Sequence, residues 1–445
     1  MDTIYTFILS ILTTIGSFFG MTDTPHTDGM NIQEITTPQG LTVWLVESHQ
    51  IPMISFDVAF KAGSVFDSEG KTGLANLTAS LLDEGAGTMD STAFKEALDD
   101  MGARLGGSAS STAASISLDT LTEHMDEAFG LFSLALTQPR FDDEAVARLR
   151  SVILSGISRR EESPTGMAQR LLREKLLEGS PYGHLTEGRA ADVATLTAAD
   201  VRDFYTRYYT KSNMVISVVG DITPEKLVDL LDGSALASLP EGAPLDWPDM
   251  PETLGTGVET QQKTTPQSSL VLAMRGVSRK DDLYYPTIVM NEVLGGGILT
   301  SRLFDVVREK NGLAYSVGSN NSPLPGGGLF TASVQTNNDT AEKALTLMRA
   351  EFDRMAATGL TDEELVDIKD YLTGSFPLRL DSNAKILSHL TMMQLEDLPR
   401  DYLDRWPERI RAVSKEGALH AAQSILNTPS RLLVVVGDGP ALKLQ

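Results

Sequence analysis

The chain has 445 residues, of which 41% are hydrophobic and 22% charged, so it is long enough for two or three globular domains. Its formal net charge of −23 argues against nucleic-acid binding, because no excess of cations offsets the repulsion between an acidic surface and phosphate groups. It contains no cysteine, which excludes disulfides, thiolate metal sites and cysteine nucleophiles and leaves the cellular compartment open.

Residues 3–20 form an uncharged run rich in Ile, Phe and Leu. A secretory signal begins with basic residues, whereas the only charge before this run is Asp2, and the Thr and Ser within it make a membrane span marginal. Two interpretations of residues 1–30 remain open. The segment is either a leader, which would place the protein in the periplasm or tether it to a membrane, or a disordered extension of a cytoplasmic chain that starts at Met21 or Met30.

A first folded unit is predicted over residues 31–232. Its opening helix lies in GLANLTASLLDEGAG, residues 73–87, where leucines form an apolar stripe and a glycine ends the helix. Asn76, Ala79 and Ser80 are spaced i, i+3 and i+4, so they share a second face, which carries only small, uncharged side chains. The other predicted elements are strands at 41–48, 53–64 and 213–222, a strand pair at 108–121, and helices at 91–101, 122–136 and 142–177.

The second half repeats this order over residues 258–445. VISVVGD at 215–221 matches LLVVVGD at 432–438, and the helical pattern from Phe141 matches that from Leu360, at separations of 217 and 219 residues. Two matches at nearly the same separation indicate a duplicated domain. The Pro- and Gly-rich residues 233–257 are the predicted linker, expected to be exposed and to make few contacts. Strands and helices without strict alternation predict the α+β class.

The six histidines provide no metal site from spacing alone, because no two of them lie three, four or five residues apart. A zinc hydrolase needs such a pair on one helix, so each histidine is interpreted as a single surface or core residue. The sequence also has no serine nucleophile elbow, and LGGGILTSR lacks the lysine and the spacing of a phosphate-binding loop.

The segment 295–319 is the richest in chemistry. Residues 301–310 predict a helix, Asn311 and Gly312 end it, and residues 313–317 predict a strand that folds back. Arg308 in the last helical turn and Tyr315 on the strand can therefore converge. Either Arg308 complements the helix dipole while Tyr315 is a half-buried strand residue, or the two side chains donate hydrogen bonds to a carbonyl oxygen that becomes an oxyanion.

Both segments resemble signatures of the pitrilysin/insulinase family of zinc peptidases, the inverzincins. AGSVFDSEGKTGLANLTASLLDEGAGT is similar to the family's H-x-x-E-H helix, and SRLFDVVREKNGLAYSV is similar to the signature that provides an Arg and a Tyr for the substrate carbonyl. The resemblance covers the chain from about residue 31. It implies two duplicated domains, each a mostly antiparallel sheet packed against helices, in a clamshell arrangement.

The resemblance places the two zinc-binding histidines at Asn76 and Ser80 and the catalytic glutamate at Ala79. The third ligand, a glutamate, falls at Gly156, next to Ser155. All three ligands and the base are replaced, so no metal is expected in this chain. Glu161 and Glu162 lie one to two helical turns further on and cannot substitute alone. Arg308 and Tyr315 both match their signature.

The family includes enzymes built from two such chains. The sequence therefore predicts the metal-free subunit of a bacterial heterodimeric peptidase, with zinc in a homologous partner that keeps H-x-x-E-H. Arg308 and Tyr315 would act on a peptide substrate in that partner's site, and the isolated chain would be inactive. The alternative is a structural or peptide-binding homologue with no role in proteolysis.

Overall fold

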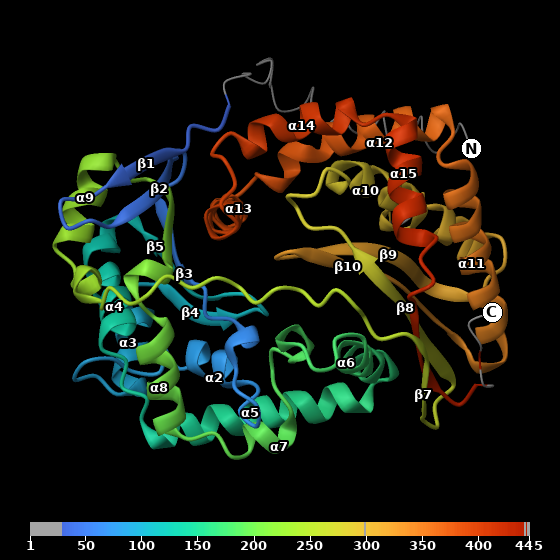
Figure 1. Cartoon of the computed structure of the whole chain (residues 1–445). Helices are drawn as coiled ribbons and strands as arrows, with labels where there is room; N and C mark the ends of the chain where they lie inside the picture. Colours follow the sequence, from blue (N-terminus) through green and yellow to red (C-terminus); the bar gives the residue numbers. More distant parts are fainter. Residues whose placement is uncertain (1–28, 298–299, 440–441, 443–445) are drawn as a thin grey trace. The chain divides into compact units, whose positions relative to one another are not determined.

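A computed structural model of the chain describes residues 29–297, 300–439 and Leu442 (Figure 1). The predicted leader or extension over residues 1–30 lies almost wholly outside these residues. Within the described residues, no helix is long and apolar enough to cross a membrane. Residues 32–445 form one compact unit by their contacts, and it contains two sheets packed against helices.

The first sheet has six strands in the order β1-β2-β6-β3-β5-β4. Its last strand along the chain, β6, lies between β2, to which it is parallel, and β3, to which it is antiparallel. The remaining pairs are antiparallel. The strands are β1 (Gln33–Thr36), β2 (Thr42–Glu47), β3 (Met53–Phe60), β4 (Arg104–Ala109), β5 (Ala114–Leu121) and β6 (Met214–Gly220).

The second sheet has five strands in the order β7-β11-β8-β10-β9, which repeats the order of β2, β6, β3, β5 and β4 and has no counterpart of β1. As β6 does between β2 and β3, β11 lies between β7, to which it is parallel, and β8, to which it is antiparallel. The strands are β7 (Gly257–Gln262), β8 (Gln267–Gly276), β9 (Ala314–Leu324), β10 (Gly327–Asn337) and β11 (Leu432–Gly437). The shared order confirms the predicted duplication and the α+β class.

Helices cover the sheets in both halves (Figure 1). The first half contains α2 (Leu74–Ser80), α3 (Ser91–Asp100), α4 (Met125–Thr137), α5 (Asp143–Glu162), α6 (Pro164–Leu176), α7 (Ala190–Val193), α8 (Ala198–Tyr208) and α9 (Pro224–Asp232). The second contains α10 (Tyr284–Asn291), α11 (Ala341–Thr358), α12 (Asp362–Ser375), α13 (Asn383–Leu395), α14 (Tyr402–Ala412) and α15 (Lys415–Leu426). Short 3₁₀ turns are η1 (Ser64–Phe66), η2 (Thr122–His124), η3 (Pro181–Gly183), η4 (Lys211–Asn213), η5 (Ala235–Ser238), η8 (Asn338–Thr340) and η9 (Phe376–Arg379).

Two helical predictions were too regular. The single helix expected over 142–177 is interrupted at Ser163, whose backbone is extended before Pro164 and whose side chain caps α6. The helix expected over 301–310 contains a π-helical stretch, η7 (Phe304–Glu309), and α10 likewise continues into a π turn, η6 (Glu292–Gly296). Hydrophobic periodicity does not distinguish these wider turns from an α-helix.

The segment 233–257 is more buried and makes more contacts than its composition predicted. Leu239, Met250 and Leu254 are buried, and the backbone N–H of Gly255 donates to the carbonyl of Leu176 at 2.8 Å. Residues 240–244 are the longest exposed run in the segment. The expectation of few contacts was therefore wrong for most of it, since apolar residues among its prolines anchor the chain to neighbouring elements.

Candidate functional site

The helix that carries the degenerate motif, α2, has its N-terminus fixed from outside. Gly73 precedes it with a φ of 92°, and the buried carboxylate of Asp67 accepts hydrogen bonds from the backbone N–H groups of Gly73 and Ala75, each at 2.8 Å. Burial raises the pKa of Asp67 to about 7, although these N–H groups act in the opposite direction. The N-terminus of α2 is therefore held in place by a side chain from the preceding loop.

The motif residues themselves do not fit a zinc ion. Asn76 and Ser80 are partly buried on the face predicted from their spacing, and Ala79 is fully buried. α5 packs against α2, but its Gly156 has no side chain, and a Cβ there would meet open space. Zinc in proteins is held by imidazole, thiolate or carboxylate groups, none of which these positions provide. Among the described residues, no three His, Asp or Glu side chains are grouped to hold a metal.

Arg308 and Tyr315 meet as the turn between them predicted. Gly312, with a φ of 61°, allows the reversal, and its N–H donates to the carbonyl of Arg308 at 2.8 Å. Arg308 donates from Nη1 to the carbonyl of Tyr315 at 3.0 Å, and its guanidinium lies 4.8 Å from the ring centroids of both Tyr315 and Phe304. The side chain of Tyr315 is 83% exposed, so its hydroxyl faces solvent.

This arrangement presents two hydrogen-bond donors on one exposed patch. The guanidinium uses one N–H on the Tyr315 carbonyl and retains further donors, and the phenol of Tyr315 is a donor of another kind. Arg308 is 34% exposed and contacts two aromatic rings, which limits the freedom of its side chain. The pair can therefore bind an oxygen that carries negative charge, provided that the oxygen comes from outside this patch.

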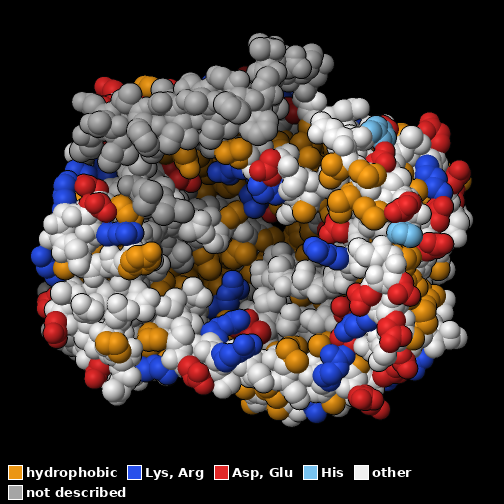
Figure 2. Space-filling model, turned by 180° about the vertical axis from the view of Figure 1, so that it is seen from behind, with side chains coloured by type: hydrophobic (Ala, Val, Ile, Leu, Met, Phe, Trp, Pro, Cys, Tyr) orange, Lys and Arg blue, Asp and Glu red, His pale blue; other side chains and the backbone are white. Residues whose placement is uncertain are grey.

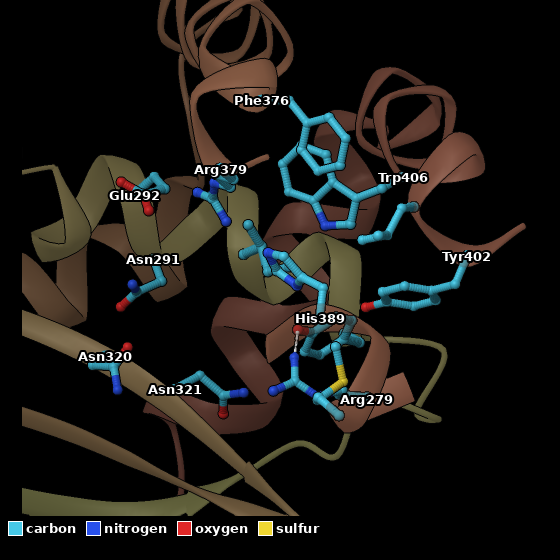
Figure 3. Close-up of a pocket in the computed structure, with 14 residues that line it drawn as sticks. Arg279, Asn291, Glu292, Asn320, Asn321, Phe376, Arg379, His389, Tyr402 and Trp406 are labelled. Carbon is cyan, nitrogen blue, oxygen red and sulfur yellow. Dashed lines mark hydrogen bonds between the residues drawn. The ribbon is translucent and has the colours of Figure 1, made fainter. Parts of the chain in front are cut away.

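The structure also shows polar groups that the sequence did not single out. A cavity of about 170 Å³ in the second half is lined by Arg279, Glu292, Arg379 and His389, with Trp406 on its wall (Figure 3). These residues come from five separate elements and loops, so no local motif joins them. By its spacing, His389 was interpreted as a single histidine. Only the duplication of the domain points to the cavity that it lines.

A second, larger cavity of about 580 Å³ lies where the first sheet, α13 and the β9–β10 hairpin meet. Serines and the carboxyls of Asp57 and Asp119 line its first-sheet side, and Arg279 and Met392 belong to both cavities. Seen from behind, the molecule has a recess with hydrophobic side chains inside it and Lys and Arg side chains near its edge (Figure 2).

The described residues thus form two sheets packed against helices, and the positions of the degenerate motif carry no zinc-binding side chain. Residues 42–188 match the profile of Insulinase (Peptidase family M16), and residues 195–372 match that of the Peptidase M16 inactive domain. The chain belongs to peptidase family M16, the insulinase or pitrilysin family, as the sequence resemblance predicted.

Known relatives agree with this assignment. A Helicobacter pylori protein named non-peptidase homolog YmxG is 26% identical over 86% of each chain, and a Bacillus subtilis protein named uncharacterized zinc protease YmxG is 24% identical over 92% of this chain and 99% of its own. The crystal structure of a peptidase M16 inactive domain from Pseudomonas fluorescens has a TM-score of 0.87 and 30% identity, covering 93% of this chain and 99% of that one.

Proposed function

We propose that this chain is the metal-free subunit of a heterodimeric zinc metallopeptidase that degrades peptides. A homologous partner with an intact H-x-x-E-H helix would supply the zinc ion and the catalytic base. This chain would supply Arg308 and Tyr315, which donate hydrogen bonds to the substrate carbonyl oxygen as negative charge develops on it. The isolated chain would bind no zinc and cleave no peptide.

The observation that carries the proposal is the exposed Arg308–Tyr315 pair. A phenol that is 83% exposed contributes little to the stability of the fold, whereas it is accessible to a substrate bound between two chains. The same chain lacks every zinc ligand of its family's motif. A carbonyl-binding pair without a metal is useful for proteolysis only if another chain provides the metal.

The proposal is tested in the complex reconstituted with the zinc-bearing partner. Arg308→Ala and Tyr315→Phe should each lower kcat by about 10²–10³, because the donors act mainly on charge that develops in the transition state. Tyr315→Phe is the sharper variant, since it removes one hydroxyl and keeps the ring beside Arg308. Tyr371→Phe, another exposed tyrosine in the same half, is the matched control and should leave kcat unchanged.

The rival function is a structural or peptide-binding homologue with no role in proteolysis. It is favoured by the hydrogen bond from Arg308 to the Tyr315 carbonyl, because the pair then stabilises its own turn. In that case Arg308→Ala would lower the free energy of unfolding by roughly 0.3–1 kcal/mol and leave kcat intact. Wild-type kcat from both variants, with association of the subunits verified by gel filtration, would remove the catalytic role of the pair and leave the structural rival.

A further inference from the structure

The two sheets can be superimposed residue by residue through their registers. In the first sheet, Ile216, Val58, Ile116 and Gly107 follow one another across strands β6, β3, β5 and β4. The corresponding row in the second sheet, across β11, β8, β10 and β9, is Leu433, Leu272, Ala332 and Ser319. Ile216 and Leu433 are also equivalent in the repeated sequence, so Gly107 corresponds to Ser319.

These two positions identify the counterpart of the metal helix. A Cβ at Gly107 would overlap the carbonyl oxygen of Ala79 on α2, and Ser319 donates to the Oδ1 atom of Asn291 on α10 at 2.8 Å. The helical segment of α10 and η6 therefore corresponds to α2. On it, Ile288, Asn291 and Glu292 share one face at the same spacing as Asn76, Ala79 and Ser80.

The repeated face opens into the 170 Å³ cavity, which all three of its residues line. Arg379 and His389 face into the same cavity (Figure 3). The guanidinium of Arg379 lies 5.2 Å from the Trp406 ring, which itself stacks on Phe376 at 4.6 Å. This contact orients the guanidinium toward the cavity, whereas neither Arg379 nor His389 has a hydrogen-bond acceptor among the described residues.

The neighbouring charges determine what these two donors can bind. Arg279 is already engaged, because its Nε donates to Glu396 at 2.9 Å and its Nη1 to the hydroxyl of Tyr284 at 2.7 Å. Burial lowers the pKa of His389, and the charges of Arg379 and Arg279 lower it further. An anion beside the imidazole would offset this repulsion. Burial raises the pKa of Glu292 and the charge of Arg379 lowers it, so Arg379 already faces one carboxyl, and Glu292 when ionised opposes a second negative charge.

We propose that this cavity, the counterpart of the lost metal site, binds a single carboxylate through Arg379 and His389. A carboxylate carries one negative charge and fits the planar fork of a guanidinium, whereas a phosphate dianion would be repelled by Glu292. A cavity of about 150 Å³ holds a molecule the size of benzene, so the occupant is a carboxylate with a few carbon atoms. The proposal depends on the proposed function in one respect only, namely that the carboxylate belongs to a peptide.

Binding is measured on the isolated full chain with three short peptides of glycine and alanine. The first ends in a free carboxylate, the second is its C-terminal amide, and the third is an amide with one internal glutamate. The pKa of His389 is followed by NMR on histidine-labelled protein, with His389→Gln to assign the signal. Binding should raise this pKa by about one unit. A response to the first peptide identifies a C-terminal carboxylate, and a response to the third an acidic side chain.

Arg379→Gln should weaken binding of the responsive peptide by about tenfold, because one charge-assisted pair is lost. The matched control is Arg409→Gln, since Arg409 also lies over an aromatic ring, that of Tyr285 at 5.3 Å, and is outside the cavity. Glu292→Gln should strengthen binding and admit inorganic phosphate, which the wild type should not bind.

The proposal is overturned if none of the three peptides shifts the pKa of His389, if the amide without glutamate binds as well as the free acid, or if Arg379→Gln binds like the wild type. This test measures binding to the isolated chain, whereas the test of the heterodimer measures kcat of the reconstituted complex. A failure of the heterodimer proposal would therefore not affect this result, and loss of carboxylate binding would not affect the kcat test.

Discussion

Each half of the chain places one helix on the sheet of the other half, and the two contacts differ in chemistry. α6 of the first half packs on β8 and β11 through buried apolar residues, among them Leu172, Leu176 and Val271. α13 of the second half packs on β3 and β6, where Thr391 donates to Asp57 at 2.7 Å and Gln394 donates to Ser217 at 2.7 Å.

The difference lies in the side chains and not in the backbone. In the aligned registers, Asp57 of β3 corresponds to Val271 of β8, and Ser217 of β6 corresponds to Val434 of β11. All four positions are buried. One plan thus supports an apolar contact, whose stability comes from burial, and a polar contact, whose stability depends on hydrogen bonding and protonation. The two motif faces differ in the same manner, since only the second opens on charged groups.

The largest expected effect concerns the first motif face and metal binding. Asn76→His with Ser80→His should leave the chain without stoichiometric zinc, because two imidazoles do not complete a site. Adding Gly156→Glu should raise the content to about one zinc per chain, since α5 packs against α2 and the space at Gly156 is open. The measurement is elemental analysis after gel filtration.

The wild-type chain, measured beside these variants, should contain no stoichiometric zinc. One zinc per wild-type chain, together with chelator-sensitive peptide cleavage, would show that the first half has a metal site built from other residues. The contrast between an uncharged motif face in the first half and a charged cavity in the second half would then be wrong.

The next effect tests the apolar contact. Leu176→Ala should lower the free energy of unfolding by about 2–5 kcal/mol, because Leu176 is only 1% exposed and its loss leaves a cavity between α6 and the second sheet. Leu378→Ala is the control, since Leu378 is 65% exposed and should change stability by less than about 0.5 kcal/mol. Equal losses of stability for the two variants in urea denaturation would contradict the conclusion that burial of apolar side chains stabilises this contact.

The smallest effect concerns Asp57 in the polar contact. Burial raises the pKa of Asp57 to about 6 from 3.8, and the hydroxyls of Thr391 and Ser115 offset only part of this. The folded state therefore binds the proton more tightly than the unfolded state. Its contribution to stability is complete below about pH 4 and is lost as the pH rises through 6, by up to about 3 kcal/mol.

Asp57→Asn should abolish this part of the pH dependence and be at least as stable as the wild type at pH 7. Urea denaturation from pH 4 to 8 measures it. Asp67 remains in both proteins and contributes a loss of the same sign, so the comparison is the difference between the two curves. Thr391→Val should enlarge the loss, because it removes a donor to the ionised carboxylate. Identical curves for wild type and Asp57→Asn would refute the argument.

Much of the fold was accessible from sequence because it is encoded locally. The apolar runs of β6, β8 and β11 and the alternation in β2 and β3 predicted these strands, and the glycine turn before Tyr315 predicted its approach to Arg308. The motif comparison predicted the replaced zinc ligands, because each lies at a fixed position in a long signature. These predictions needed no information about distant parts of the chain.

The remainder depends on contacts between distant residues. The placement of β6 between β2 and β3 is determined by long-range pairing. The sequence around Asp57 likewise does not indicate that Thr391 will donate a hydrogen bond to it. Arg379 and His389 come together only after α13 and η9 have packed beside α10. The repeated VVGD sequences indicated the duplication, but their separation of 217 residues does not place Glu292 opposite Ser80.

The insertion of the final strand into the middle of each sheet has a consequence for synthesis on the ribosome. β2 and β3 do not pair with each other in the finished sheet, because β6 lies between them, and β11 separates β7 from β8 in the same way. Val43 can therefore pair only after Ile216 has been synthesised, and Val258 only after Leu433. Such non-local pairing makes folding slow. In a nascent chain that ends before Met214, the edges of β2 and β3 that pair with β6 are unpaired. Such unpaired edges are prone to aggregation, which chaperones prevent.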